Sequence, residues 1–398
     1  MDITIQPGKL SGTVTPIPSK SQAHRYLICA AFADRETTII CPETNRDIEA
    51  TADCLQSLGA KISRNSDGYT VIPIAEAPKS ATLGCAESGS TLRFLLPIAG
   101  ALGVDTTFLM EGRLPQRPLS PLWEEMERMG CRLSRPTENT LHCEGKLLPG
   151  EYSIDGGVSS QYITGLLFAL SLLGQPSKLK ITGKIESKPY IEMTKAAMQK
   201  FGIDPTQHTS QRYRSPGTLK VEGDWSNGAF WIGAKNLGSD LSIKGLNPHS
   251  AQGDKMSDPL LRAIATSAGA PVIHAGDIPD LVPILSVVAA ASNGVVLHDI
   301  QRLRLKESDR VATVVEMIQN LGGTAIATED TLRIIGTGLT GGTVNSHNDH
   351  RIAMAAAIAA TVCQEPVTIQ GAEAVNKSYP KFWDEYRKLG GNYEQHIR

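Results

Sequence analysis

The sequence predicts a mixed α/β protein built from six copies of one helix-and-strand unit, and three observations lead to this fold class. The chain has 398 residues, which at about 150 residues per domain corresponds to two or three domains, each large enough for an apolar core. Six predicted helices each end on an apolar or small residue followed by a glycine, at similar intervals. Short alternating stretches, typical of half-buried strands, lie between the helices.

Each unit is expected to begin with a polar turn and an apolar helix and to include a second, amphipathic helix. The first helices begin near Lys20, Ser88, Val158, Asp224, Asp277 and Asn348. Because Ala, Leu, Ile and Val cover nearly every side of these helices, we expect them to lie inside a domain. The second helices are expected to end just before Gly59, Gly130, Gly202, Gly269, Gly322 and Gly390, where a positive φ favours glycine.

Strands are predicted over residues 60–64, 68–72 and 331–335, where apolar and polar residues alternate beside turn residues. Each unit therefore reads as helix, strand, helix, strand, strand or close to it. The alternative is an unrelated α/β protein whose helices end in glycine by coincidence.

The composition excludes several functional classes. Hydrophobic residues make up 41% and charged residues 20%, so the main state is folded rather than disordered. The formal net charge is −2, which leaves no basic surplus for a nucleic-acid backbone. An anionic ligand must therefore be bound by local clusters of Arg and Lys.

The sequence also predicts a soluble, cytoplasmic protein. Its seven cysteines are an odd number without a C-x-x-C pair, and we expect reduced thiols. The first residues lack a basic start and an apolar segment typical of a signal peptide. The longest nearly apolar run, residues 352–363, is far below the ~20 residues that span a bilayer.

The polar starts of the apolar helices are candidate anion sites, because helix N-termini present free N–H groups and partial positive charge. The first start carries Lys20, Ser21 and Arg25, and the second is the small-residue stretch Ser88-Gly89-Ser90. Each is weak evidence alone, since a Lys-Arg pair at a helix start is usually solvated. If the starts converge, the site between them should bind carboxylates or phosphates.

Charged residues in the second half add to this pattern. Arg351 opens a helix made almost entirely of Ala, Ile and Met, so it is expected to meet a ligand or a buried carboxylate. The stretch 302–310 is the most charged in the chain; alternatively it is a solvated loop in which Ser308 or Asp309 caps the next helix. Asp280 enters an apolar helix, where it could also be a dipole partner.

Two other motifs do not fit a cofactor or metal site. Gly336-Thr337-Gly338-Leu339-Thr340-Gly341 matches G-x-G-x-x-G, but the following residues do not open a helix, so the dinucleotide reading fails. His347 and His350 lie three residues apart, but the chain has no closely spaced His/Cys set, and anion binding explains this segment better.

Taken in order, the motifs resemble those of the 5-enolpyruvylshikimate-3-phosphate (EPSP) synthases, members of the enolpyruvyl transferases. The resemblance covers residues 8–385, nearly the whole chain. Nine motifs carry it: Lys20-Ser21-x-x-x-Arg25, Gly89-Ser90-x-x-Arg93, Gln116-Arg117-Pro118, Ser159-Ser160-Gln161-Tyr162, Ser187-Lys188-Pro189-Tyr190-Ile191, Ile278-Pro279-Asp280, Leu305-Lys306-Glu307-Ser308-Asp309-Arg310, Asn348-Asp349-His350-Arg351 and Lys377-Ser378-Tyr379-Pro380.

The resemblance implies two similar globular domains, each an inverse α/β barrel of three units, around a ligand cleft. The discontinuous domain, 1–18 with 224–398, would carry phosphoenolpyruvate and catalytic residues, and 19–223 would carry most of the shikimate 3-phosphate site. The implied reaction transfers the enolpyruvyl group of phosphoenolpyruvate to the 5-hydroxyl of shikimate 3-phosphate by addition and elimination. It implies a monomer acting on these small molecules, with no metal, organic cofactor, nucleic acid or membrane partner.

The resemblance also implies roles for individual residues. Asp280 is similar to the family's base and Glu307 to its proton donor, with Lys20 as a second proton-handling candidate. Residues similar to the phosphoenolpyruvate site are Lys20, Gly89, Arg117, Gln161, Arg310, Arg351 and Lys377. Residues similar to the shikimate 3-phosphate site are Lys20, Ser21, Arg25, Ser159, Ser160, Gln161, Ser187, Tyr190, Asp280 and Lys306.

Two alternatives and two departures accompany this reading. A UDP-N-acetylglucosamine enolpyruvyl transferase would share the fold but place a reactive Cys in the loop 112–118, which has none. A non-catalytic anion-binding relative could keep the scaffold, although Asp280, Glu307 and the cations are retained. Glu87 stands where the family commonly has Asn and would repel an anionic ligand unless paired; Arg302 also replaces an Asn.

Overall fold

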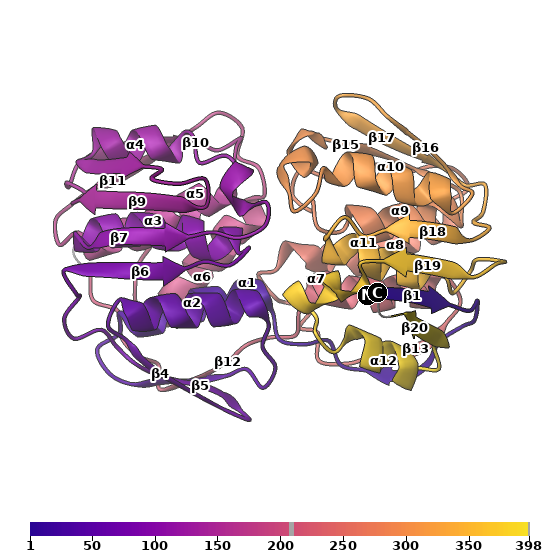
Figure 1. Ribbon diagram of the computed structural model, residues 1–398, viewed down its shortest axis with the longest axis horizontal. Coiled ribbons are helices and arrows are strands. Elements are labelled where there is room, and N and C mark those ends of the chain that lie inside the picture. The colour runs from indigo at the N-terminus through magenta and orange to yellow at the C-terminus, as the bar shows by residue number, and fades with distance from the viewer. Residues whose placement is uncertain (207–210, 397–398) are drawn as a thin grey trace. The chain divides into compact units, whose positions relative to one another are not determined.

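The computed structural model describes residues 1–206 and 211–396. The chain divides into two compact units (Figure 1). Each unit has its own hydrophobic core. The inserted unit is the continuous segment Pro18–Val221. The terminal unit combines Met1–Ile17 with Glu222–Arg398, so the chain leaves it once and returns once.

The described part of the inserted unit contains three sheets. Their strands are β3 (Thr37–Ile40), β4 (Lys61–Asn65), β5 (Gly68–Ile72), β6 (Ser80–Gly84), β7 (Asp105–Leu109), β8 (Cys131–Ser134), β9 (Thr140–Gly145), β10 (Glu151–Asp155), β11 (Lys178–Thr182) and β12 (Thr218–Lys220). The strand orders are β12-β3-β5-β4, β6-β7-β9-β8 and β10-β11. Alternate residues of β7 and β10 are buried, so one face of each of these sheets faces the core.

Six α-helices complete the described part of the inserted unit. Three of them are buried almost all round: α1 (Lys20–Ala31), α3 (Gly89–Leu102) and α5 (Ser160–Leu172). The other three bury one side only: α2 (Arg46–Ser57), α4 (Leu122–Arg128) and α6 (Lys188–Lys200). The apolar helices therefore lie inside and the half-exposed sheets outside.

The terminal unit repeats this plan. Its strands are β1 (Asp2–Ile5), β2 (Ser11–Val14), β13 (Asp240–Ile243), β14 (Val272–His274), β15 (Val295–His298), β16 (Thr324–Ala327), β17 (Thr331–Ile335), β18 (Gly342–Asn345), β19 (Val367–Gln370) and β20 (Tyr393–His396). They form sheets in the orders β18-β19-β1-β20, β13-β2 and β14-β15-β17-β16. Strand β1 pairs with β19 and β20, which joins the start of the chain to its end.

The inner helices of the terminal unit are α7 (Trp225–Asn236), α9 (Val282–Ala290) and α11 (His350–Ala359). The outer ones are α8 (Ser257–Thr266), α10 (Arg310–Asn320) and α12 (Phe382–Lys388). The described part of the terminal unit also has three short 3-10 helices, η2 (Gly253–Met256), η3 (Gln301–Leu305) and η4 (Ala372–Lys377), and that of the inserted unit has one, η1 (Leu114–Gln116). Every residue of α9 and α11 is buried, as predicted from sequences that are apolar apart from Ser286, His350 and Arg351.

The predicted repeat and fold class are confirmed, with one local correction. Glycines 59, 130, 202, 322 and 390 have φ between 75° and 109°, as expected for residues that end helices. The prediction for Gly269 is wrong, because α8 ends at Thr266 and Ser267 is already extended (φ −67°, ψ 148°). The chain has left the helix before it reaches Gly269, so no positive φ is needed there.

Three further expectations are met. The strands predicted near 60–64, 68–72 and 331–335 are β4, β5 and β17. The G-x-G-x-x-G stretch lies between β17 and β18 and opens no helix. All seven cysteines are free and buried.

No described helix is both long and apolar enough to cross a membrane.

Candidate active site

The three inner helices of the inserted unit are capped by serines. Ser19, Ser88 and Ser159 each accept a hydrogen bond from a backbone N–H in the first turn of α1, α3 and α5, respectively. These short caps fix the backbone where the predicted ligand-binding side chains begin. Ser160 is the first residue of α5 and is buried.

At the start of α1, two predicted cations have defined partners. Lys20 Nζ lies 2.7 Å from Asp47 Oδ2, and both side chains are 15% exposed. The Arg25 guanidinium donates to Thr194 Oγ1 at 2.8 Å, to the Tyr190 carbonyl at 3.0 Å and to the Ser21 carbonyl at 2.6 Å. Burial lowers the pKa of Arg25 to about 10. The structure thus brings Ser21, Arg25 and Tyr190 together.

The starts of α3 and α5 meet through Gln161. Its side-chain oxygen accepts from Arg93 at 2.7 Å, and its amide nitrogen donates to Ser90 Oγ at 3.0 Å. Arg117 lies against Gly89: a Cβ on this glycine would come within 2.7 Å of Arg117 Nη1. Gly89, Gln161 and Arg117 are therefore placed at neighbouring helix starts.

Ser187 precedes α6 in the left-handed conformation, with φ 52°, and is buried. A serine rarely adopts this conformation, so the surrounding structure holds the turn in place. The next turn of α6 contains Tyr190, whose carbonyl binds Arg25. The predicted residues Ser187 and Tyr190 thus lie at the start of one helix.

The terminal unit contains a dense cluster of opposite charges, centred on Arg310. This residue is fully buried and donates to Asp280 Oδ1 at 2.7 Å, to Glu307 Oε2 at 2.8 Å and to Asp349 Oδ2 at 3.0 Å. Arg351 Nη2 lies 3.1 Å from Asp280 Oδ2. The carboxylate that Arg351 meets is therefore Asp280 in the turn before α9, whose side chain is 17% exposed.

These charges strongly alter the ionisation of the cluster. Burial alone would raise the pKa of Asp280, but Arg351, Lys306 and Arg310 together hold it far below its usual range. Burial lowers the pKa of Lys306 to about 8, although Asp280 opposes the shift. Burial would also lower the pKa of Arg310, but its three carboxylate partners raise it.

Lys377 lies at the end of η4, and its Nζ donates to the Asn348 carbonyl at 2.8 Å. Asn348 is in the left-handed turn that precedes α11, and Asp349 caps this helix by accepting from the Arg351 N–H at 3.0 Å. Lys377 is therefore placed at the turn that leads into Arg351.

Comparison with known proteins decides the family. The model of the family described as "EPSP synthase (3-phosphoshikimate 1-carboxyvinyltransferase)" matches residues 5–386. A 3-phosphoshikimate 1-carboxyvinyltransferase from Clostridium kluyveri is 38% identical over 420 residues, covering 99% of this chain and 98% of the relative. One from Clostridium botulinum (strain Eklund 17B / Type B) is 39% identical over 424 residues, with 98% of each covered. The chain belongs to the EPSP synthase family.

Solved structures support the same fold. An EPSP synthase from Acinetobacter baumannii has a TM-score of 0.80 at 21% identity and covers all of both chains. An enolpyruvyl transferase from Streptomyces tendae has a TM-score of 0.74 at 17% identity, covering 100% of this chain and 99% of that one. The six-unit α/β architecture is thus that of EPSP synthases and enolpyruvyl transferases.

Three carboxylates that lie close to predicted site residues were missed in the sequence analysis. Asp47 pairs with Lys20, and Asp349 pairs with Arg310. Asp254 in η2 is also buried; burial and the nearby charge of Asp280 raise its pKa to about 7, against the opposing effect of Arg351. Asp349 adjoins Arg351 in a predicted motif, which was the available signal for it. Asp47 and Asp254 belong to no predicted motif.

The departure Glu87 has a defined place in this member of the family. A Cβ on Gly112 would overlap the Glu87 carboxylate, so this side chain packs over the Gly112 backbone. Gly112 has φ 55°. The Glu87 position therefore depends on a glycine in the loop that leads to Arg117.

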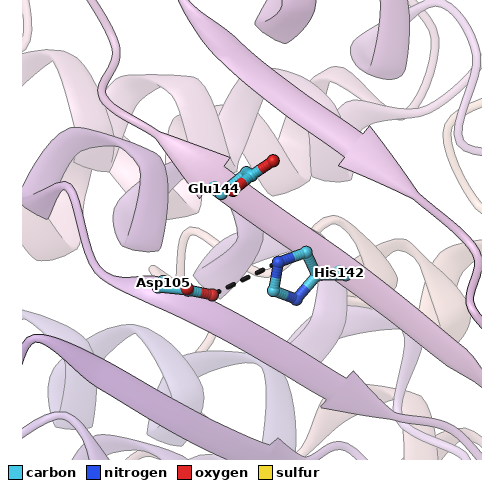
Figure 2. Close-up of side chains that lie close together, drawn as sticks. All are labelled: Asp105, His142 and Glu144. Carbon is cyan, nitrogen blue, oxygen red and sulfur yellow. Dashed lines mark ion pairs between the residues drawn. The ribbon is translucent and has the colours of Figure 1, made fainter.

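A separate group, Asp105, His142 and Glu144, is the one described set of three side chains with metal-ligand spacing (Figure 2). Its members lie on β7 and β9. His142 Nε2 lies 3.3 Å from Asp105 Oδ1, while Glu144 pairs with Arg132 at 2.6 Å. All three side chains are partly exposed, and a cation already neutralises Glu144. Cross-strand ion pairing accounts for this group without a metal.

Proposed function

We propose that this protein transfers the enolpyruvyl group of phosphoenolpyruvate to the 5-hydroxyl of shikimate 3-phosphate, which yields 5-enolpyruvylshikimate 3-phosphate and phosphate. This is a step of the shikimate pathway, which leads to chorismate and the aromatic amino acids. The observation that carries the proposal is the cluster of Asp280 with the buried Arg310 and Arg351 in a chain of the EPSP synthase family. It combines a proton acceptor with fixed positive charge, as two anionic substrates require.

In the proposed mechanism, the 5-hydroxyl oxygen bonds to C2 of phosphoenolpyruvate while C3 gains a proton. The resulting tetrahedral intermediate then loses phosphate from C2 and a proton from the new methyl group. Asp280 accepts the hydroxyl proton, and Glu307 or Lys20 handles the proton at the carbon. Arg310, Arg351 and Lys377 hold the phosphoenolpyruvate anion together with Lys20, Gly89, Arg117 and Gln161.

The low pKa of Asp280 makes it a weak base in the unliganded protein. An anion that binds Arg351 and Arg310 shares their positive charge, so less of that charge stabilises the Asp280 carboxylate. We therefore infer that phosphoenolpyruvate binding raises the basicity of Asp280 when the hydroxyl proton has to be removed.

Glu307 has the opposite requirement. A carboxyl group must be protonated to act as an acid, whereas the 2.8 Å ion pair with Arg310 favours the carboxylate. The same substrate anion that draws Arg310 toward itself would weaken this pair. Lys20, paired with Asp47, supplies an ammonium proton without such a change.

The shikimate 3-phosphate site in this proposal uses Ser21, Arg25, Ser159, Ser160, Gln161, Ser187 and Tyr190 of the inserted unit, with Lys20. The terminal unit contributes Asp280 and Lys306. The hydroxyl groups at capped helix starts and the buried Arg25 suit a phosphate and a polyhydroxylated ring.

The decisive experiment measures phosphate release from phosphoenolpyruvate with shikimate 3-phosphate as acceptor, beside the same assay with UDP-N-acetylglucosamine. Release with shikimate 3-phosphate alone supports the proposal. Release only with the sugar nucleotide assigns the other acceptor, and silence with both favours a non-catalytic anion-binding protein. We further propose that the protein is a cytoplasmic monomer, which sedimentation and cell fractionation test.

Substitution of Gly89 by alanine is expected to raise the KM for phosphoenolpyruvate about tenfold or more, because a displacement near 1 Å is that costly to a binding group. The new Cβ would come within 2.7 Å of Arg117 Nη1, so the guanidinium must move. The end of an arginine is flexible, so the unfolding midpoint should change little. Steady-state kinetics checks this result. Gly84→Ala is the control, since nothing lies within 4 Å of its Cβ; equal KM values in both variants would contradict the placement of Arg117.

The pH dependence of kcat/KM for shikimate 3-phosphate is expected to follow the protonation of Lys306. Its pKa is lowered to about 8, so its ammonium charge is lost as the pH rises through that value. We expect kcat/KM for shikimate 3-phosphate to fall above about pH 8, since this parameter follows the free enzyme. Lys306→Arg keeps the charge and should shift the fall to higher pH. An unchanged profile in that variant would remove Lys306 from the site.

A further inference from the structure

A continuous chain of buried polar side chains crosses the first three helices of the inserted unit. His24 Nδ1 on α1 lies 2.7 Å from Thr51 Oγ1 on α2, and Thr51 Oγ1 lies 2.7 Å from Thr91 Oγ1 on α3. Thr91 then donates to Ser88 Oγ at 2.8 Å. None of these four residues is more than 1% exposed. The chain ends at the cap of α3, next to Gly89.

The hydrogen bonds that link these four side chains can all donate in one direction, from His24 toward Ser88. The Thr91 hydroxyl has a single hydrogen, which it donates to Ser88, so it must accept from Thr51. The Thr51 hydroxyl is then committed to Thr91 and must accept from His24. His24 therefore carries its proton on Nδ1, while its buried Nε2 has no hydrogen-bond partner among the described residues.

The ionisation of His24 agrees with this direction. Burial, together with the charges of Lys20 and Arg25, holds the pKa of His24 well below its usual range. Its ring edge packs against Phe94 of α3 at a centroid distance of 6.3 Å. A neutral ring needs no acceptor at Nε2, whereas a protonated ring would bury an unpaired donor there.

Helix α2 links this chain to the predicted catalytic lysine. Asp47 and Thr51 are four residues apart and lie on the same side of α2. The Asp47 carboxylate holds Lys20 at 2.7 Å, and the Asp47 carbonyl oxygen lies 3.4 Å from Thr91 Oγ1. The first two turns of α2 thus contact the start of α1 through Lys20 and His24 and the start of α3 through Thr91.

We propose that Thr51 is a positioning residue, which fixes the start of α1 with Lys20 relative to the start of α3 with Gly89. Apolar side chains of the same shape would fill this interior but could pack in several ways. Hydrogen bonds between paired polar side chains instead fix one position of each helix relative to the next. Thr51 touches no substrate in this proposal and acts through its two neighbours. The inference rests on the proposed enolpyruvyl transfer, because the positions that it fixes are those of substrate-binding groups.

The kinetic test compares Thr51→Val, which keeps the shape and removes the hydroxyl, with Thr51→Ser, which restores it. We expect kcat/KM for phosphoenolpyruvate to fall at least tenfold in Thr51→Val and to return to within about twofold of wild type in Thr51→Ser, since small displacements of binding groups are costly. The control is Thr106→Val, another fully buried threonine, whose hydroxyl donates to the nearby Val104 carbonyl at 2.9 Å. Loss of stability without loss of kcat/KM in folded Thr51→Val, as in the control, would overturn the positioning role.

A spectroscopic readout separates this inference from the proposed function. Nitrogen-15 NMR of labelled imidazoles distinguishes Nδ1–H from Nε2–H, and His24→Gln identifies the signal. We expect a neutral Nδ1–H ring in wild type, lost in Thr51→Val and kept in Thr51→Ser. An inactive wild type with this signature would defeat the enolpyruvyl transfer but leave the hydrogen-bond chain intact. A wild-type Nε2–H ring would defeat the chain, whatever the activity.

Discussion

Replacement of Asp280 by asparagine is expected to lower kcat about 10³-fold, because general base catalysis contributes factors of this size. Asparagine keeps the shape and can still accept from Arg310 and Arg351, but it cannot take the hydroxyl proton. The two arginines also lose a counter-charge, so the KM for phosphoenolpyruvate should stay the same or fall. Steady-state kinetics and a direct binding titration with shikimate 3-phosphate measure the two effects.

The control for this substitution is Asp258→Asn, since Asp258 forms an exposed pair with Arg262 on α8. Its kcat should remain within about twofold of wild type, as expected for a surface ion pair. If Asp280→Asn weakened shikimate 3-phosphate binding as much as it lowered kcat, Asp280 would be a binding group and not the base.

The second large effect is on stability. Arg310→Met removes the fully buried partner of Asp280, Glu307 and Asp349, which leaves three carboxylates close together without their shared cation. Breaking a buried ion pair in this way costs about 3–5 kcal/mol of unfolding free energy. Urea denaturation of both proteins at pH 7 should show a loss of that size, together with loss of activity.

The pH dependence gives this prediction a second test. In wild type, Asp280 has a pKa below its unfolded value, so its contribution is complete above about pH 4 and is lost as the pH falls below that. The difference between wild type and Arg310→Met should therefore shrink in acid. Arg262→Met, which breaks the exposed pair on α8, should cost no more than about 1 kcal/mol. Similar losses in the two variants would mean that the cluster is not stabilised by its buried cation.

The fold was predictable because each copy of its repeat can be recognised from short stretches of sequence. Apolar helices with polar starts, and glycines after the second helices, are properties of short segments that need no knowledge of distant contacts. The wrong prediction at Gly269 shows where such local patterns fail. Helix α8 ends at Thr266 because the backbone becomes extended at Ser267, and the position of the glycine does not predict this earlier end.

The cations of the candidate site could be predicted from the sequence more readily than the carboxylates that pair with them. Lys20, Arg310 and Arg351 stand out at helix starts. The apolar context of Arg351 predicted either a ligand or a buried carboxylate, and the structure places it beside Asp280, whose side chain is 17% exposed. Asp47 and Asp254 did not stand out, since an acid near a helix start is ordinary on a solvated surface. Only the packing of α2 against α1 brings Asp47 to Lys20, 27 residues away along the chain. The serine and aspartate caps, in contrast, are local and follow from sequence.

The pairing of β1 with β19 and β20 has a consequence for synthesis of the chain. Asp2 is opposite Gln370 in one neighbour and His396 in the other. At translation rates of about 5–20 residues per second, β1 would wait roughly 20–80 s for these partners. The inserted unit ends at Val221 and has all its strands long before then. On the ribosome, the inserted unit is thus expected to fold first, while β1 stays unpaired and its strand edges are open to aggregation.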